Sequence, residues 1–241
     1  RGYTAPVVDW FEPTRQSALA LRRGMDSALR QSALAIVDWS RPPQSEELRD
    51  HPAAGFLLYG AYSELTLEHP GGNPPSEAER ARSRSRLIAW LAEPDISTQG
   101  EHVSLPRISN LSTTDHATAD IACMVRWWDI EPQNSMGLAA AAPDQFAQAR
   151  RHIGTALDHL AAAAPGLHAE FATIIGDIVV AVPDGTELLR YDAGSSFALW
   201  GSCIVNAARH EGWPRYCKSL VHEEAHNLLF AIAREEPLVA N

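Results

Sequence analysis

The stretch KSLVHEEAHNLLF, residues 218–230, contains a His-Glu-x-x-His motif inside a run of apolar residues at helical spacing. Pro214 is well placed as the first residue of this helix. Residues four apart on a helix lie on one face, about one turn along. His222 and His226 would therefore present two imidazoles to a single divalent metal ion. Imidazole suits zinc, iron, nickel and copper, so the pair predicts a metal without identifying it.

Glu223 stands beside the histidine pair, where metallopeptidases carry the glutamate that activates a metal-bound water. The alternative is an ordinary helix with two surface histidines. A chance match to the motif is on the order of a few per cent for a chain of this composition. The two histidines fall at the edge of the helix's apolar stripe, a position that suits the wall of a cleft.

Composition excludes some functions. The chain has 241 residues, is 45% hydrophobic and carries a formal net charge of −10, which argues against nucleic acid or an anionic membrane as partner. Its cysteines, Cys123, Cys203 and Cys217, show no CxxC spacing and are expected to be free thiols. No apolar run is long enough to span a bilayer and no signal peptide is evident, so we expect a cytoplasmic protein.

The chain order predicts a mostly α protein of the α+β class with a small antiparallel sheet. Helices are expected at 14–39, 45–67, 76–91, 115–128, 144–164 and 167–180, and strands at 103–108, 187–191 and 198–206. A linker at 131–143 separates an N-terminal helical region, 1–135, from a metal-binding region, 143–241. The first region is a candidate peptide-binding unit. A strand followed by the motif helix resembles the zincin plan, in which an edge strand can pair with an extended peptide beside the metal.

The third metal ligand is not evident from the motif. A catalytic metal usually takes three protein ligands and keeps one open position. The extended metzincin pattern would place glycine and histidine where Leu229 and Ile232 stand, so that class is excluded. Glu235 and Glu236 lie more than two turns past the pair, too far to join it.

Three residues upstream of the motif are candidates for the third ligand: His210, Asp192 and Glu187. His210 is the weak favourite among them, because it lies in the loop before the motif helix and could fold back. The simplest expectation is that the third ligand lies beyond Asn241. The metal-binding region would then lack its C-terminal continuation.

The segments DAGSSFALWGSCIVN (192–206) and SLVHEEAHNLLFAIAREEPL (219–238) resemble a bacterial family of HExxH-motif peptide-modification proteins, encoded beside peptide natural-product clusters. The resemblance covers roughly residues 145–241, and its clearest matches are 193–196, Gly201 and 222–226. Members are described as 2-oxoglutarate-dependent, iron-containing peptide β-hydroxylases. The resemblance implies Fe(II) and 2-oxoglutarate as cofactors and a ribosomally synthesised precursor peptide as partner.

The same resemblance suggests roles for further residues. The distal carboxylate of 2-oxoglutarate calls for a cation, and arginine binds carboxylates with two parallel hydrogen bonds. Arg215, on the same helical face as His222, is the first candidate for binding this carboxylate, and Arg190 is the second. The alternative for Arg215 is a surface residue or a helix-capping residue. Ser195, Ser196 and Asn206 are candidates for binding the substrate or the co-substrate. The alternative for the serines is that they simply form a turn.

Three hypotheses follow from the sequence. The first is an Fe(II)/2-oxoglutarate peptide hydroxylase, which fits the C-terminal resemblance and the missing peptidase elements. The second is a zinc-dependent metallopeptidase, which rests on the motif alone. The third is a non-catalytic peptide-binding accessory protein, which fits the missing third ligand. The sequence leaves the oligomeric state open.

Overall fold

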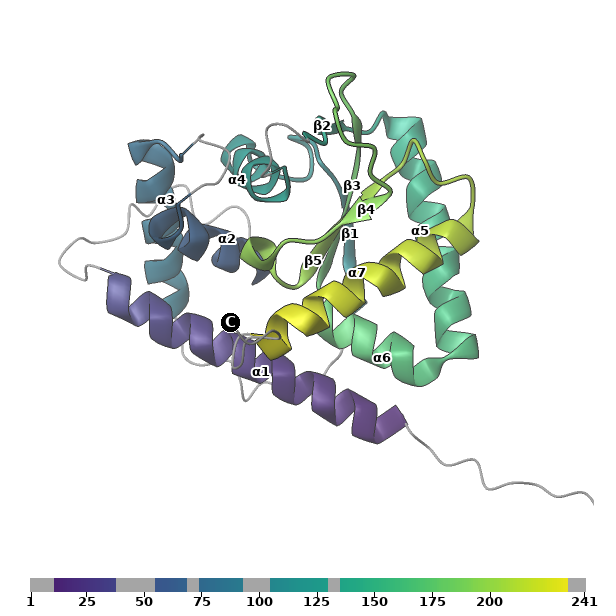
Figure 1. The fold of residues 1–241 in the computed structure, drawn as a ribbon, viewed down its shortest axis with the longest axis horizontal. Coiled ribbons are helices and arrows are strands. Elements are labelled where there is room, and N and C mark those ends of the chain that lie inside the picture. Colours follow the sequence, from purple (N-terminus) through teal and green to yellow (C-terminus); the bar gives the residue numbers. More distant parts are fainter. Residues whose placement is uncertain (1–10, 38–54, 69–73, 93–104, 130–134, 234–241) are drawn as a thin grey trace, which may run out of the picture.

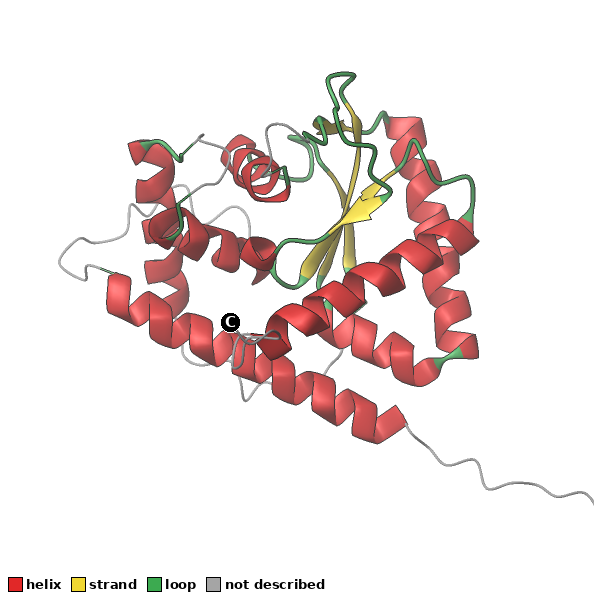
Figure 2. Cartoon of the chain, in the orientation of Figure 1, coloured by secondary structure: helices red, strands yellow, loops and turns green. Residues whose placement is uncertain are grey.

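A computed structural model describes residues 11–37, 55–68, 74–92, 105–129 and 135–233. Helices make up most of this part and surround a small sheet (Figures 1 and 2). The helices are α1 (Phe11–Ile36), α2 (Gly55–Thr66), α3 (Glu77–Ala92), α4 (Thr118–Trp128), α5 (Pro143–Ala163), α6 (Pro165–Ile174) and α7 (Trp213–Ala233), with a 3-10 turn η3 (Phe197–Leu199). The strands are β1 (Arg107–Asn110), β2 (Leu138–Ala140), β3 (Asp177–Pro183), β4 (Ala193–Gly194) and β5 (Ser202–Asn206). The α+β class is confirmed.

The sheet is mixed, so the prediction of an antiparallel sheet was wrong. Its order is β1-β3-β5-β4, in which β1, β3 and β5 run parallel and β4 lies antiparallel at one edge. Strand β2 pairs antiparallel with the end of β3. The physical reason lies in the burial of the central strands. Every residue of β5 is buried, and a strand covered on both faces is typical of parallel sheets flanked by helices.

Side chains of β3 and β5 alternate between two apolar layers, as a strand's period of two requires. Ile178, Val180, Cys203 and Val205 pack with α1, α5, α6 and α7. Val179, Ala181 and Ile204 pack with α2, α4 and η3. Figure 1 shows α5, α6 and α7 on one side of the sheet and α2 and α4 on the other. The motif helix therefore lies directly over the sheet rather than at the periphery.

Most predicted helices are confirmed within a few residues. Helix α5 matches the expected 144–164, and Ser76 and Glu79 form the expected capping box at the start of α3. Residues 45–54 of the second predicted helix lie outside the described residues, as do Glu235 and Glu236. The region expected at 131–143 to be a linker contains β2, while 130–134 are not described.

Three predictions of secondary structure differ from the structure. The helix expected at 167–180 ends at Ile174, and β3 begins after Gly176 because the β-branched run Ile178–Val180 favours a buried strand. The strand expected at 187–191 is a loop in which Leu188 and Leu189 are exposed. The strand expected at 198–206 is divided by Gly201, which has a positive φ of 87°, into η3 and β5.

The two regions predicted from the sequence share one core. Strand β1 belongs to region 1–135, yet it pairs along β3 of region 143–241. Arg22 of α1 donates hydrogen bonds to the carbonyls of Thr173 and Ile174, the last residues of α6. Cations at helix C-termini are stabilising because they meet the unpaired carbonyls there. A peptide-binding role for region 1–135 stays a prediction.

None of the helices within the described residues has both the length and the apolar character that a membrane span requires.

Helix α2 approaches α4 and η3 closely at Gly60. A Cβ atom built there would lie 2.8 Å from Sγ of Cys123 and 2.9 Å from Cδ2 of Leu199. Any larger residue at position 60 would collide with these side chains, so steric crowding rather than backbone conformation requires glycine there. Gly154, inside α5, has no atom within 4 Å of the corresponding position.

These two glycines give a matched pair of substitutions. Gly60→Ala should lower the free energy of unfolding by about 1–2 kcal/mol, because overpacking outweighs the helix propensity of alanine. Gly154→Ala should raise it by about 0.5–1 kcal/mol, because only the propensity term remains. Urea unfolding followed by circular dichroism measures both. Equal effects of the two substitutions would contradict the close packing of α2.

Candidate functional site

The two motif histidines face each other on the surface of α7. Their Nε2 atoms lie 3.0 Å apart, and their ring planes stand at 87° with centroids 4.6 Å apart. His222 is exposed and His226 is half-buried. Two ring nitrogens at this separation can share a proton, or both can bind one ion at about 2.1 Å. The predicted pairing of the imidazoles is thus present in the geometry.

Asn227 fixes the position of the motif helix. Its side chain is fully buried, accepts a hydrogen bond from the backbone N–H of Gly201 at 2.8 Å and donates to the carbonyl of Ser202 at 3.3 Å. Its own backbone carbonyl accepts the indole N–H of Trp200 at 2.9 Å. The residue after the second histidine therefore ties α7 to the segment that leads into β5. Sequence reasoning missed Asn227, although an asparagine on the buried face of an amphipathic helix signals an internal hydrogen-bonding role.

Glu223 points from α7 toward the loop after β4 and is 4% exposed. The hydroxyl of Ser195 donates to its Oε2 at 2.8 Å, and Asn227 in turn donates to Ser195 Oγ at 3.2 Å. Burial raises the pKa of the Glu223 carboxyl, and this effect exceeds the opposing effects of Ser195 and of the imidazoles of His226 and His222. The site thus contains a carboxyl held in place that favours its protonated form more than a free glutamate does.

The two predicted serines differ in their surroundings. Ser195 belongs to the hydrogen-bond network around Glu223. Ser196 opens the 3-10 turn η3, where its backbone carbonyl accepts the N–H of Leu199 and its side chain makes no capping bond. Ser195 is therefore a residue of the site, while Ser196 serves the turn in this conformation.

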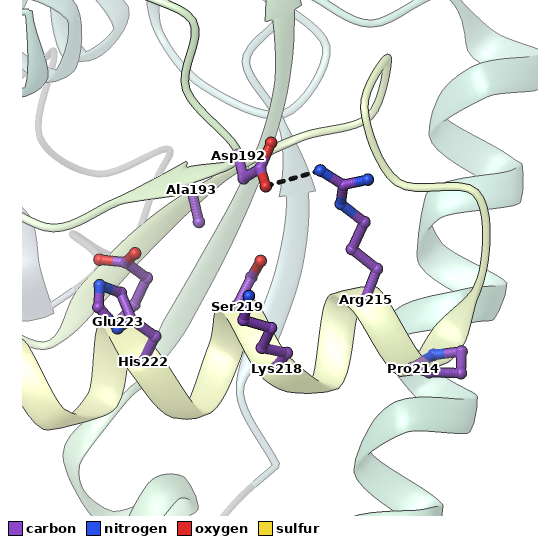
Figure 3. Close-up of a pocket in the computed structure, with 8 residues that line it drawn as sticks. All are labelled: Asp192, Ala193, Pro214, Arg215, Lys218, Ser219, His222 and Glu223. Atoms are coloured by element: carbon purple, nitrogen blue, oxygen red, sulfur yellow. Dashed lines mark hydrogen bonds and ion pairs between the residues drawn. The ribbon is translucent and has the colours of Figure 1, made fainter.

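A pocket of about 580 Å³ lies between α7 and the segment at β4 (Figure 3). It is lined by Asp192, Ala193, Pro214, Arg215, Lys218, Ser219, His222 and Glu223. Figure 3 shows these α7 side chains in order along the helix, with Asp192 and Ala193 above them. The pocket therefore extends from His222 toward the N-terminus of α7.

Arg215, the predicted co-substrate ligand, lines this pocket but already holds a carboxylate. Its Nη2 donates to Oδ2 of Asp192 at 2.9 Å, and Nε of Arg209 donates to Oδ1 at 2.6 Å. The hydrogen bonds from Arg209 and Arg215 lower the pKa of Asp192 to about 2, so this carboxylate stays ionised. Arg190 is exposed and is not among the residues that line the pocket.

The upstream candidates for the third metal ligand are not available in this conformation. Nδ1 of His210 donates to the carbonyl of Asn206 at 2.7 Å, so Nε2 of the neutral ring accepts the Ser219 hydroxyl at 3.0 Å. Burial lowers the pKa of His210, which favours this neutral ring. Asp192 is held by its two arginines, and Glu187 does not line the pocket. We therefore correct the proposal of His210 as ligand.

No group of three histidine, cysteine, aspartate or glutamate side chains arranged to hold a metal occurs among the described residues. The described residues thus contain a histidine pair without a third ligand beside it, and the zincin-like metal site stays a prediction.

Asn206 also needs a correction as a substrate-binding residue. Its side chain is fully buried, donates to the carbonyl of Tyr191 and accepts the N–H of Ala208. It shapes the end of β5 and the loop before α7, so its amide is not available to a ligand.

A second buried carboxyl, that of Glu224, lies on the side of α7 near α6. Glu224 is 1% exposed, and its Oε1 has no hydrogen-bond partner among the described residues. Burial and the nearby carboxyl of Glu170 on α6 raise the pKa of Glu224 well above its usual range. Glu224 therefore retains its proton in the folded chain at pH values where an unfolded glutamate loses it.

Comparison with known proteins assigns no family, because neither a family model nor a curated protein matches the chain.

Asn227→Ala should lower the free energy of unfolding by about 2–4 kcal/mol, because it leaves the buried N–H of Gly201 without a partner. Ser195→Ala, which removes a half-buried hydroxyl, should cost about 1 kcal/mol. Urea unfolding of both variants measures the difference. An Asn227→Ala protein as stable as the Ser195→Ala protein would show that Asn227 does not hold α7.

Glu224→Gln tests the buried carboxyl through the pH dependence of stability. Above about pH 4.5 the unfolded chain releases the Glu224 proton while the folded chain keeps it, so rising pH lowers stability by at most about 1.4 kcal/mol per pH unit. A glutamine has no proton to release. The stability of Glu224→Gln relative to the unsubstituted protein should therefore increase from about pH 4.5 into the neutral range.

Urea unfolding of metal-free protein at a series of pH values gives this difference. Glu211→Gln, at an exposed position of the loop before α7, serves as control. A difference between Glu224→Gln and the unsubstituted protein that is constant with pH would contradict the assignment.

Proposed function

We propose that this protein is an Fe(II)/2-oxoglutarate-dependent hydroxylase that modifies the β-carbon of a side chain in a ribosomally synthesised precursor peptide. The observation that carries the proposal is the 3.0 Å separation of the Nε2 atoms of His222 and His226, which presents two ligands to one ion. The resemblance of residues 192–206 and 219–238 to HExxH-motif peptide-modification proteins supplies the reaction class.

The pair suits iron and zinc alike, because imidazole nitrogen binds both metals. The choice of iron therefore rests on the resemblance rather than on the geometry of the pair. His222 and His226 would hold the metal, and the third ligand is expected elsewhere in the protein.

Iron and 2-oxoglutarate, when bound, would supply the oxidising chemistry that oxygen transfer to a C–H bond requires. The chain's own residues bind and orient. The cations of the pocket attract a carboxylate beside the histidine pair, and the buried Glu223, held by Ser195, can exchange a proton with a ligand there.

The sheet edge above the pocket supports a peptide as the substrate. Among the described residues, strand β4 pairs with β5 along one side only and is the last strand in the sheet order. Its first residue, Ala193, lines the pocket above α7 (Figure 3). An extended peptide can add to such an edge through backbone hydrogen bonds, which accept many sequences. A peptide docked there would pass over the histidine pair.

A zinc-dependent metallopeptidase is the second candidate, and Glu223 is the observation that favours it. The carboxyl of Glu223 lines the pocket beside His222, and burial raises its pKa, as a general base for a metal-bound water requires. The peptide-binding edge would serve a peptidase equally well.

Metal uptake by purified variants tests both candidates. His222→Ala and His226→Ala should each weaken Fe(II) binding by at least about 100-fold, because a single imidazole remains. His168→Ala, at a helical histidine on α6 outside the pair, should leave uptake unchanged. Anaerobic equilibrium dialysis with metal analysis measures all three.

The reaction then separates the candidates. Iron-dependent conversion of 2-oxoglutarate to succinate, stimulated by the precursor peptide, supports the oxygenase. Peptide cleavage with zinc and without oxygen rejects it in favour of the peptidase. A protein that takes up no metal yet binds the peptide is the non-catalytic accessory protein.

A further inference from the structure

Lys218 is the single lysine of the 241-residue chain, in which arginine fills every other Lys or Arg position. It lies on α7 four residues before His222, on the same face and about one turn, or ~6 Å, along the helix. Its side chain lines the pocket beside the histidine pair (Figure 3). The chain thus places its one flexible, compact ammonium group next to the candidate metal site.

The other polar side chains of the pocket are already engaged. Arg215 holds Asp192, which also binds Arg209. The Ser219 hydroxyl donates to His210. Each of these groups has a partner that a ligand would have to displace.

Lys218 is exposed and, within the described part of the chain, has no hydrogen-bond or ion-pair partner. An ammonium without a partner can bind an incoming carboxylate without first breaking an internal bond. Charge-assisted hydrogen bonds of this kind are roughly twice as strong as neutral ones.

We infer that Lys218 binds the distal carboxylate of 2-oxoglutarate, while the keto-acid end of the molecule faces the histidine pair. This rests on the proposed function. One helical turn between Lys218 and His222 matches the length of a five-carbon diacid laid along α7, since that chain spans about 5 Å. Arg215 lies seven residues before His222, about 10 Å along the axis, and is too distant for the same task.

The assignment makes Lys218 the residue that selects a dicarboxylate. 2-Oxobutanoate has the same keto-acid end but no distal carboxylate, so it would gain nothing from the ammonium. The protein should therefore bind 2-oxoglutarate about 10–100-fold more tightly than 2-oxobutanoate, the range of one hydrogen bond to a charged group.

Isothermal titration under anaerobic conditions, with Fe(II)-loaded protein and both keto acids, tests this. Lys218→Met should lower the ratio of the affinities for 2-oxoglutarate and 2-oxobutanoate to about one. Lys218→Arg should keep part of the preference for 2-oxoglutarate. Arg215→Met is the matched control and should keep most of the preference. Fe(II) uptake should be unchanged in all three variants, because each retains both His222 and His226.

The single lysine offers a second readout that does not depend on turnover. Reductive methylation with ¹³C-formaldehyde labels Lys218 as the one side-chain amine of the chain, giving one lysine methyl signal in NMR spectra. 2-Oxoglutarate should shift this signal, and 2-oxobutanoate should shift it much less.

The outcomes separate the two levels of inference. Iron-loaded protein that binds 2-oxoglutarate equally well with Lys218→Met, or that loses its preference with Arg215→Met instead, overturns the assignment of Lys218 and leaves the oxygenase standing. Iron-loaded protein that binds no 2-oxoglutarate overturns the oxygenase, and the assignment of Lys218 with it.

Discussion

The candidate site depends on one buried asparagine. Asn227 holds the N–H of Gly201 with its side-chain oxygen and the indole of Trp200 with its backbone carbonyl. These bonds join one position of α7 to the segment that leads into β5 and limit rotation of the helix there. His222 then lies across the pocket from Ala193 of β4 with His226 beside it, while Glu223 faces the loop after β4. This anchor adds to the packing of Tyr216, Leu220 and Ala231, which hold α7 against the same core.

The sequence predicted the helices well because their signals are local. The capping box at Ser76 and Glu79, the proline at the start of α5 and the apolar period of α7 act within a few residues. The sheet was predicted poorly because its determinants are not local. The run Ile174–Val180 is apolar apart from Gly176 and Asp177, and periodicity alone does not separate a buried helix from a buried parallel strand. Only the pairing of β3 with β1 and β5, distant in the sequence, decides the question.

The site shows the same division between local and non-local information. The histidine pair follows from a spacing of four residues on one helix, and it was predicted. The side chains of Asn206, His210 and Arg215 form hydrogen bonds with other segments of the chain. These bonds could not be deduced from the sequence, because they depend on the fold. Lys218 is an intermediate case. The sequence shows that it is the single lysine, while only the structure shows that no described residue pairs with it.

The surroundings of the histidine pair differ along α7, and this difference bears on the choice of reaction. Toward the N-terminus the wall carries Arg215 and Lys218. Toward the C-terminus the ring of Phe230 lies nearly parallel to that of His226 at 6.2 Å, and Phe197, 49% exposed, meets Phe230 edge to face at 6.0 Å.

A cationic wall on one side and an aromatic wall on the other suit two ligands of different chemistry bound at the same time. A small anion would occupy the first side, and an apolar side chain of a peptide lying along β4 would occupy the second. A peptidase needs one substrate and water, whereas an oxygenase of the proposed class must hold a dicarboxylate and a peptide together. The two-sided arrangement therefore favours the oxygenase on grounds independent of the metal.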